Sequence, residues 1–444
     1  MTNEKNNSKK LGVFTATCFV IANMIGTGVF TSLGFQVVGI PSVFALLMLW
    51  VVGGIIALCG AFCYGELGAA LPRSGGEYHL LSRIYHPALG FLSGWVSLTV
   101  GFAAPTALAA IALVSYLNAA VADFPARHLA AGVVMMFTVI HGVSIRVGSR
   151  AHNFFTTLKV TLILIFIAAA FWIKPAQSIS LLPRSGDGQL LATSAFAVSL
   201  VFVSFAYSGW NAAIYVVGEI RQPQKNLPPA LFAGTLVVTV LYVLLNYVFL
   251  YTVPLADLAG KIEVAYLSGN RVFGPAGGKI MALTLAFLLL STVSGHVFVG
   301  PRITQVMGED YPVLRTLKTK SRRGIPLNAM IFQLAIVVLL IYTSTFEQVM
   351  IYAGFVLNLI TTLAVAGVFV LRIQKPELPR PYRTWGYPVT PAIFLLVSGW
   401  TLVYVMMARP LESLSGLGIV LLGLGVYFMS ERSIRETKRN GVLK

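Results

Sequence analysis

Long runs without a charged residue constrain the fold of this chain more than any other feature of its sequence. No Asp, Glu, Lys or Arg occurs from Leu11 to Gly65, from Ile84 to Ala122, or from Asn226 to Ala256. A helix that crosses the hydrocarbon core of a bilayer needs about 20 consecutive apolar residues. Only 11% of the 444 residues are charged, whereas soluble domains contain about 25%. A water-soluble globule is therefore excluded, and the sequence predicts an all-α polytopic membrane protein.

Apolar segments separated by charges and turn residues predict twelve transmembrane helices. The predicted spans lie near residues 11–35, 42–66, 88–118, 128–145, 154–173, 192–218, 229–252, 279–301, 327–343, 346–371, 391–408 and 414–430. They divide the chain into a tail at 1–10, a block of five spans at 11–173, a second block of five at 192–371, two additional helices at 391–430 and a tail at 431–444. Because five is an odd number, the second block enters the membrane inverted relative to the first.

The distribution of basic residues predicts the orientation of the protein. With the N-terminus inside, the inner segments carry 24 of the 32 Lys and Arg, the outer loops carry seven, and Lys159 lies within a span. The positive-inside rule then predicts that both termini are cytosolic. The net charge of +17 is thus a signal of topology and does not indicate nucleic-acid binding. The one glycosylation sequon, at Asn6, falls in the cytosolic tail, which favours a bacterial cytoplasmic (inner) membrane.

Glycine-containing segments interrupt the first and sixth spans. Residues 24–30 read Met-Ile-Gly-Thr-Gly-Val-Phe, and residues 205–211 read Phe-Ala-Tyr-Ser-Gly-Trp-Asn. Glycine lowers helix propensity, and backbone groups freed by a break in hydrocarbon must line a cavity or find a protein partner. Either segment alone also fits tight helix packing by small residues. Because each segment opens a block of five spans, the pair favours the broken helices of a secondary transporter with a site near the membrane midplane.

Five segments along most of the chain resemble motifs of the amino acid–polyamine–organocation (APC) transporters, especially the L-amino acid transporter branch. They are Ile-Gly-Thr-Gly-Val-Phe at 25–30, Pro-Arg-Ser-Gly-Gly-Glu-Tyr at 72–78, the junction at 141–159, the interrupted helix at 205–211 and the loop at 219–228. The resemblance implies a LeuT-type fold, a 5+5 inverted repeat with helices 1 and 6 broken, and an amino acid bound between them. Two positions depart from the family pattern, since Ser208 replaces a frequent glycine and Gly218 a glutamate. The loop at 119–127 has no cysteine, so no disulfide-linked accessory subunit is expected.

A zwitterionic amino acid needs one site for its carboxylate and another for its ammonium group. The N–H groups of Thr27 and Gly28, at the start of the second half of span one, offer an anion site at the positive end of a helix dipole. Carbonyls of Phe205, Ala206 and Ser208, at the end of the first half of span six, offer the cation site. The expected substrate-binding residues are Met24, Gly26, Thr27, Gly28, Phe205, Ala206, Ser208 and Asn211.

The absence of charged residues within the spans predicts which substrate side chains the protein prefers. All 15 acidic residues fall in tails, loops or span ends, and no arginine lies at mid-membrane. A charged substrate normally needs a partner of opposite charge, because buried charge is costly. Neutral L-amino acids are therefore the expected substrates, and cationic amino acids or polyamines are the alternative. Phe205 either packs as an ordinary aromatic residue or closes over the ligand, which the resemblance favours.

Lys159 and His296 are the expected coupling residues. Lys159 is the one formal charge within a span, and near a helix end its amine can reach the interface. The resemblance matches it to a lysine whose ammonium takes the place of a cation in sodium-coupled relatives. It thereby implies sodium-independent transport and contacts of Lys159 with spans one and eight. His296 fits either a packing role or a proton relay, because imidazole titrates near neutrality.

Two other classes of membrane protein compete with a carrier. A membrane-embedded enzyme needs converging ligands or a nucleophile–base pair at one depth, and the six histidines and three cysteines show no such spacing. A channel favours a charged or carbonyl-lined pore over paired broken helices. We therefore expect neither catalytic residues nor a metal nor a cofactor. Exchange and proton symport both remain open.

Overall fold

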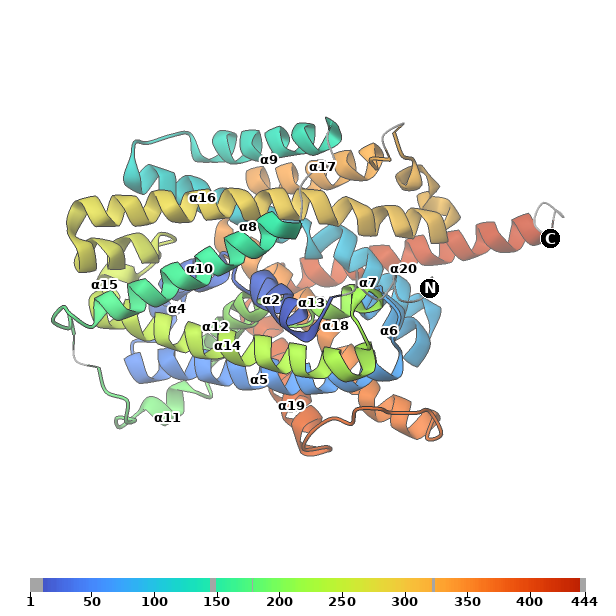
Figure 1. Cartoon of the computed structure of the whole chain (residues 1–444), viewed down its shortest axis with the longest axis horizontal. Coiled ribbons are helices and arrows are strands. Elements are labelled where there is room, and N and C mark those ends of the chain that lie inside the picture. Colours follow the sequence, from blue (N-terminus) through green and yellow to red (C-terminus); the bar gives the residue numbers. More distant parts are fainter. Residues whose placement is uncertain (1–10, 144–148, 178, 322–323, 440–444) are drawn as a thin grey trace.

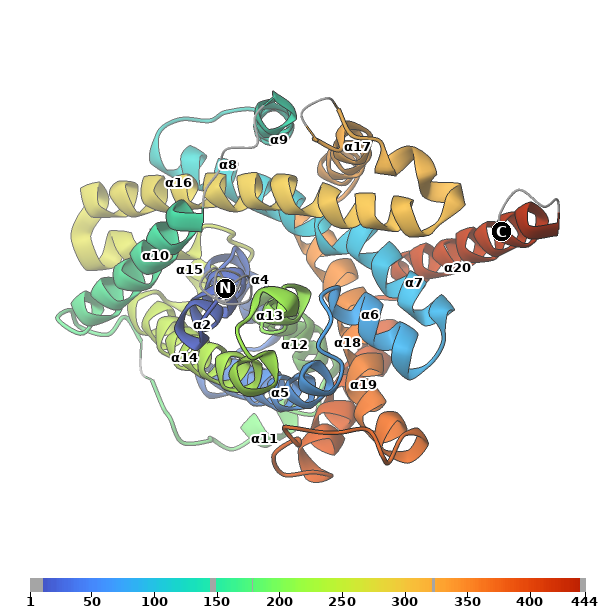
Figure 2. The same ribbon diagram turned by 45° about the vertical axis from the view of Figure 1, so that its right-hand side comes forward.

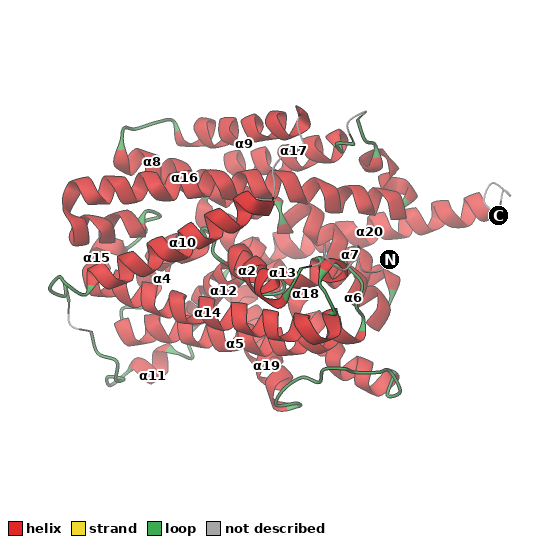
Figure 3. Cartoon of the chain, viewed as in Figure 1, coloured by secondary structure: helices red, strands yellow, loops and turns green. Residues whose placement is uncertain are grey.

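The computed structural model describes residues 11–143, 149–177, 179–321 and 324–439. In this part of the chain the backbone forms helices and connecting loops, without a named strand (Figure 3). A single isolated bridge pairs Leu11 with Ile220. The predicted tail at 1–10 and the last residues of the predicted tail at 431–444 lie outside the described residues.

Among the described residues, the first half of the chain forms ten helical elements. They are α2 (Val13–Met24), α3 (Gly28–Thr31), α4 (Leu33–Gly39), α5 (Val43–Ala70), α6 (Gly76–Ile84), α7 (Pro87–Val96), the π-helical segment η1 (Ser97–Gly101), α8 (Ala103–Ala120), α9 (Ala126–Val143) and α10 (Ser149–Ala170).

The second half begins with short helices and ends with long ones. Its elements are α11 (Asp187–Leu190), α12 (Ser194–Tyr207), α13 (Ala212–Tyr215), η2 (Val217–Glu219), α14 (Pro223–Thr252), α15 (Leu255–Leu258), α16 (Val264–Asp310), η3 (Pro312–Lys318), α17 (Leu327–Thr343), α18 (Phe346–Gln374), α19 (Val389–Ala408) and α20 (Pro410–Arg439).

The helices have the length and composition of membrane spans. Within the described residues, nine helical segments are long and apolar enough to cross a bilayer. Three shorter apolar helices, Thr157–Ala170, Ser194–Tyr207 and Leu327–Thr343, lie where three further spans are predicted. The prediction of an all-α polytopic membrane protein is thus confirmed, and the count of twelve spans stays a prediction.

Several helix boundaries differ from those predicted, among them the starts of the seventh and eighth spans. The seventh span begins at Pro223, ahead of the predicted start at residue 229, because proline is well accommodated at the first position of a helix. The eighth span extends back to Val264 through Gly274, whose φ of 74° interrupts the helical geometry. The predicted outer loop at 253–278 therefore contains helix as well.

Both glycine-containing segments interrupt their helices. Helix α2 ends at Met24, and helical geometry resumes at Gly28 in α3. Ser32 keeps helical dihedral angles, so α3 and α4 continue in one direction. Helix α12 ends at Tyr207, and a turn over residues 208–211 precedes α13. Figure 2 shows α2 and α13 side by side at the centre of the molecule, and contacts between the two helices confirm the arrangement.

The two ends of the bundle carry different connecting segments. Figure 1 shows α11 and α15 toward the left-hand end, and α6 with the C-terminal part of α20 toward the right-hand end. We name these the outer end and the inner end, after the orientation that the basic residues predict. The loops predicted to share a membrane side thus gather at the same end of the structure.

Aromatic side chains pack together in the outer half of the bundle. Phe35 stacks on Phe346 with 5.7 Å between the ring centroids, and it meets Phe202 at 6.1 Å. The hydroxyl of Tyr116 donates a hydrogen bond of 2.9 Å to the carbonyl of Phe30. These contacts join α4 and its neighbours to α8, α12 and α18 on the outer side of both interruptions.

Candidate functional site

A cavity of about 770 Å³ lies between the two interrupted helices and extends toward the inner end. Its other walls come mainly from α5, α7, η1, α16 and α18. The aromatic residues that pack in the outer half do not line it. All ten predicted site residues line this one cavity: Met24, Gly26, Thr27, Gly28, Lys159, Phe205, Ala206, Ser208, Asn211 and His296.

Two glycines allow the interruptions to approach each other. A Cβ atom on Gly28 would lie 2.6 Å from the Cα of Ala206, so the first interruption contacts the second through bare backbone. Gly209 has a φ of 102°, and a Cβ atom there would lie 2.6 Å from the carbonyl oxygen of Asn23. Such a φ strains every residue except glycine. The glycine pattern of the sequence is thereby explained by close contact as well as by the break itself.

The first interruption presents free backbone donors to the cavity. The N–H groups of Thr27, Gly28 and Val29 have no acceptor among the described residues, and Thr27 and Gly28 line the cavity. Helical hydrogen bonding resumes when the N–H of Phe30 donates to the carbonyl of Thr27 at 3.0 Å. Converging N–H groups at the start of a helix favour an anion. This geometry suits a carboxylate.

The second interruption presents carbonyls that already have a protein donor within hydrogen-bond distance. The carbonyl of Phe205 accepts from the N–H of Ser208 at 3.0 Å. The hydroxyl of Tyr242, on α14, donates to the carbonyl of Met24 at 2.6 Å and reaches that of Ala206 at 3.3 Å. Because a carbonyl oxygen has two lone pairs, each still accepts a second donor. Tyr242 thus links both interruptions, and the sequence alone did not single it out.

Lys159 joins three helices beside the first interruption. Its Nζ atom, on α10, lies 3.3 Å from the carbonyl oxygen of Ile25 and 3.5 Å from the Oγ1 atom of Thr292 on α16. These are the spans that the resemblance associates with Lys159. Its position beside the interruption differs from that of a lysine whose amine reaches out to the membrane interface.

His296 lies on α16 in the wall of the cavity. Its ring lies 6.2 Å from that of Phe102, edge to face, and its Nδ1 atom is buried without a hydrogen-bond partner among the described residues. Its backbone carbonyl accepts from the side chain of Gln333 at 3.2 Å. The ring is therefore positioned mainly by packing.

Glu77 is the main residue of the cavity wall that the sequence analysis missed. It lies in the loop motif at 72–78, where an acidic residue is expected to be solvated, yet only 2% of it is exposed. Its carboxylate accepts from Tyr64 at 2.9 Å and, at short range, from Asn211 and Tyr215. The expected binding residue Asn211 thus also serves a partner inside the protein. The sequence signal that could have identified Glu77 is an acidic residue that directly follows two glycines in the motif.

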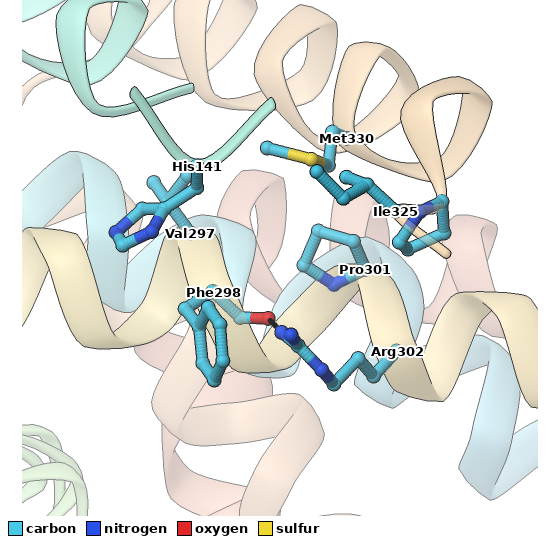
Figure 4. A pocket seen from close by; sticks show the side chains of 8 residues that line it. His141, Val297, Phe298, Pro301, Arg302, Ile325 and Met330 are labelled. Carbon is cyan, nitrogen blue, oxygen red and sulfur yellow. Dashed lines mark hydrogen bonds between the residues drawn. The ribbon is translucent and has the colours of Figure 1, made fainter. Parts of the chain in front are cut away.

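Figure 4 shows a second, small pocket of about 10 Å³. It shares His141 and Phe298 with the cavity. The guanidinium of Arg302 lies 3.4 Å from the centroid of the Phe298 ring and donates to the carbonyl of the same residue. His141 is only 4% exposed, and its Nε2 atom lies 2.9 Å from the hydroxyl of Ser294. His141, at the end of α9, is therefore covered by α16.

The charged lining of the cavity is sparse. Lys159 and Glu77 are the formally charged side chains among its lining residues. Within the described part of the chain, no group of three His, Cys, Asp or Glu side chains is arranged to hold a metal ion. The cavity therefore offers a polar, nearly neutral environment with backbone donors on one side and backbone acceptors on the other.

The fold and this cavity define a class: a polytopic α-helical membrane protein with a central site between two interrupted helices. A comparison with protein families matches residues 11–415 to the family described as Amino acid permease. The chain belongs to this family, which confirms the resemblance in the sequence and identifies a transporter rather than an enzyme.

Individual relatives align along nearly the whole chain. The chain is 30% identical to the b(0,+)-type amino acid transporter 1 of Mus musculus over 431 residues, which cover 95% of this chain and 88% of the relative. It is 31% identical to the Large neutral amino acids transporter small subunit 2 of Mus musculus over 433 residues, covering 95% of this chain and 81% of the relative. The protein of that name from Homo sapiens is likewise 31% identical, with 95% and 80% covered.

Proposed function

We propose that this protein is a secondary transporter that carries neutral L-amino acids across a membrane without sodium, by alternating access. One observation supports the proposal above all others. The cavity lies between two interrupted helices, one with free N–H groups and the other with carbonyls that accept a further donor. This pair of sites matches the carboxylate and the ammonium of an amino acid without any charged side chain. The names of the relatives agree with such a substrate class.

Alternating access requires two gates that are not open together. The outer half is closed by the stacking of Phe35 on Phe346 and its contact with Phe202. The cavity extends from the interruptions toward Glu77 at the inner end. This asymmetry corresponds to an inward-facing state. Transport then requires that the aromatic contacts separate while the inner half closes.

The architecture that we propose is a LeuT-type fold of twelve helices. Spans at 11–173 and 192–371 form the two inverted repeats, and spans at 391–430 are additional. The two interruptions support the division, because each opens one of the repeats. Both termini lie in the cytosol and the membrane is a bacterial inner membrane, as the basic inner loops and the sequence features favour.

The charges of the cavity favour neutral substrates. Glu77 is the one carboxylate among the lining residues, and it already accepts from three donors. A cationic side chain would have to displace at least one of them. Cationic amino acids or polyamines are the second candidate, because one of the relatives is named a b(0,+)-type transporter.

Lys159 and His296 are the proposed coupling residues. The Nζ atom of Lys159 lies 3.3 Å from the carbonyl oxygen of Ile25. The resemblance implies that sodium-coupled relatives bind a cation at this position, which favours transport without sodium. His296 lines the same cavity on α16. An exchanger keeps both groups in one protonation state, whereas a proton symporter changes that of at least one.

An accessory chain linked by a disulfide does not form part of the proposal. One relative is named a small subunit. In this chain, however, the loop between α8 and α9 has no cysteine, and Cys59 and Cys63 are buried in α5. We propose no cofactor, no metal and no nucleic-acid partner. The surroundings are the lipid bilayer.

Uptake of labelled L-alanine by purified protein in liposomes without sodium tests the proposed function. Vesicles are either preloaded with unlabelled L-alanine or empty with an inward proton gradient. Uptake only into preloaded vesicles identifies an exchanger, and gradient-driven concentration identifies a proton symporter. Protein-free vesicles are the control, and labelled L-arginine tests the cationic alternative. Absence of uptake of every neutral amino acid would contradict the proposal.

A further inference from the structure

The amide of Asn211 has one end bound inside the protein and the other end free. Its Nδ2 atom donates to the Oε1 atom of Glu77. Its Oδ1 atom has no hydrogen-bond partner among the described residues and is not among the buried polar atoms without one. Asn211 is half-buried and lines the cavity. The free amide oxygen is therefore accessible from the cavity.

Glu77 determines which end of this amide is free. An ionised carboxylate only accepts hydrogen bonds, so it binds the NH₂ end of an asparagine and not the oxygen end. The hydroxyls of Tyr64 and Tyr215 add two further donors to the same carboxylate. Three donors thus converge on the carboxylate of Glu77 and hold it in place, and hydrogen bonds to a charged acceptor are stronger than those between neutral groups.

The Asn211–Glu77 pair joins the second interruption to α6. Asn211 lies in the turn between α12 and α13, directly after the second interruption. Glu77 lies in α6, and Tyr64 lies in α5. A side chain of the interrupted helix is thus oriented by helices outside it.

We propose that Glu77 is a positioning residue that orients the Asn211 amide so that its oxygen accepts a hydrogen bond from the bound amino acid. This inference rests on the proposed function. The group that it recognises is an N–H or O–H donor of the substrate. The α-ammonium group and the hydroxyl or amide of a polar side chain both supply this chemistry. Glu77 itself does not contact the substrate.

A reciprocal exchange of the two side chains tests the proposal. Glu77→Gln removes the preference for the NH₂ end, because a glutamine binds either end of an asparagine. We expect the KM for L-serine uptake to rise about five- to tenfold with a smaller change in kcat, the range of one hydrogen bond. Asn211→Asp places two carboxylates together and raises the KM at least as much. In the double variant, the introduced glutamine donates to one oxygen of the introduced aspartate and leaves the other oxygen free.

The double variant separates positioning from a purely structural role. We expect it to restore the KM to within about threefold of the wild-type value, because the free acceptor is regained. Tyr64→Phe is the matched control, since it removes one donor to Glu77 but keeps the contact with Asn211. Its KM should rise less than that of Glu77→Gln. A double variant that is no better than either single variant would overturn the proposal.

A second pair of variants tests the proposal if the Glu77→Gln/Asn211→Asp double variant does not fold. In an Asn211→Ala background, Glu77→Gln should leave the KM unchanged, because the side chain through which Glu77 acts is absent. A further rise of severalfold there would overturn the proposal. Comparing L-alanine with L-serine identifies the donor. Equal changes in KM indicate the ammonium, and a larger change for serine indicates the hydroxyl.

Uptake by the wild-type protein in the same liposomes distinguishes failure of the proposed role of Glu77 from failure of the proposed function. Uptake by the wild type together with an unchanged KM in Glu77→Gln overturns the role of Glu77 alone. Absence of wild-type uptake overturns the proposed function, and this inference with it.

Discussion

The two interrupted helices differ in how far the protein already satisfies their backbone groups. At the first interruption, the N–H groups from Thr27 to Val29 have no acceptor among the described residues. At the second, the carbonyl of Phe205 accepts from Ser208, and that of Ala206 is reached by Tyr242. One interruption therefore offers empty donors, and the other offers acceptors that are partly in use.

This difference indicates how the two ends of an amino acid are recognised. Unpaired N–H groups in a low-dielectric site are costly, so a carboxylate that binds them removes a penalty. The carbonyls lose less when the site is empty, because each keeps a protein donor within hydrogen-bond distance. We therefore expect the carboxylate to provide the larger share of the affinity and the ammonium to provide orientation. Substitutions around both interruptions test this comparison, and their expected effects follow from the largest to the smallest.

Gly209→Ala should have the largest effect. The φ of 102° costs a non-glycine residue about 1–2 kcal/mol, and the new methyl group would lie 2.6 Å from the carbonyl oxygen of Asn23. We expect L-alanine uptake to fall at least about a hundredfold, since about 1.4 kcal/mol corresponds to a factor of ten. Gly399→Ala, in α19, is the control, because an added Cβ atom there would meet no atom within 4 Å. Uptake close to that of the control would contradict the account of the second interruption.

Gly28→Ala should have the next largest effect. Its methyl group would lie 2.6 Å from the Cα of Ala206, but its backbone is not in the left-handed region. Because crowding acts here without backbone strain, we expect a loss of uptake of at least about thirtyfold, smaller than that for Gly209→Ala. Equal losses in the two variants, measured in the same liposomes, would remove the distinction between strain and crowding.

Lys159→Ala should impair transport or uncouple it. The variant removes the ammonium that contacts the carbonyl of Ile25 at 3.3 Å and the hydroxyl of Thr292 at 3.5 Å. We expect uptake to fall at least about tenfold, because the charge is lost together with two contacts. Thr292→Val removes only the contact with α16 and should cost less. Full activity of Lys159→Ala would refute the coupling role.

Tyr242→Phe should loosen the link between the two interruptions. It removes the donor to the carbonyls of Met24 and Ala206. We expect the protein to lose about 1 kcal/mol of stability and the KM for L-alanine to rise by a few fold, the usual range for one buried hydrogen bond. A thermal unfolding curve in detergent and an uptake series measure the two effects. An unchanged midpoint and KM would show that the hydroxyl does not stabilise the site.

Ser208→Ala should have the smallest effect. The cation site relies on backbone carbonyls, which the substitution leaves in place, and no hydrogen bond from the Ser208 hydroxyl to a described residue occurs. We expect the KM for L-alanine to rise less than about threefold. A change of tenfold or more would indicate that the side chain, and not the backbone, binds the ammonium.

The sequence predicts the positions of the two interruptions and the residues there that line the cavity. Gly26, Gly28 and Gly209 mark the breaks because glycine is a local signal, readable without knowing the fold. The family motifs placed Lys159 beside spans one and eight, where the structure has its contacts with Ile25 and Thr292. Each of these signals consists of residues that are neighbours in the sequence.

The two site residues that the sequence did not predict, Tyr242 and Glu77, depend on contacts between residues that are distant in the sequence. Tyr242 reaches Met24 across 218 positions, and Asn211 reaches Glu77 across 134. A tyrosine within a span looks like any other membrane aromatic residue, and an acidic residue in a loop looks solvated. Only the packing of α14 and α6 against the interruptions gives these two side chains their roles.

Competition by analogues of a substrate tests the central claim most directly. Uptake of labelled L-alanine by the wild-type protein is measured with an excess of unlabelled L-alanine, of L-alaninamide or of propionate. The amide keeps the ammonium but lacks the carboxylate, and propionate has the reverse composition. The account predicts that L-alanine abolishes the labelled uptake, that propionate competes weakly and that L-alaninamide competes least. Inhibition by L-alaninamide as strong as that by L-alanine would contradict the assignment of the carboxylate to the free N–H groups of the first interruption.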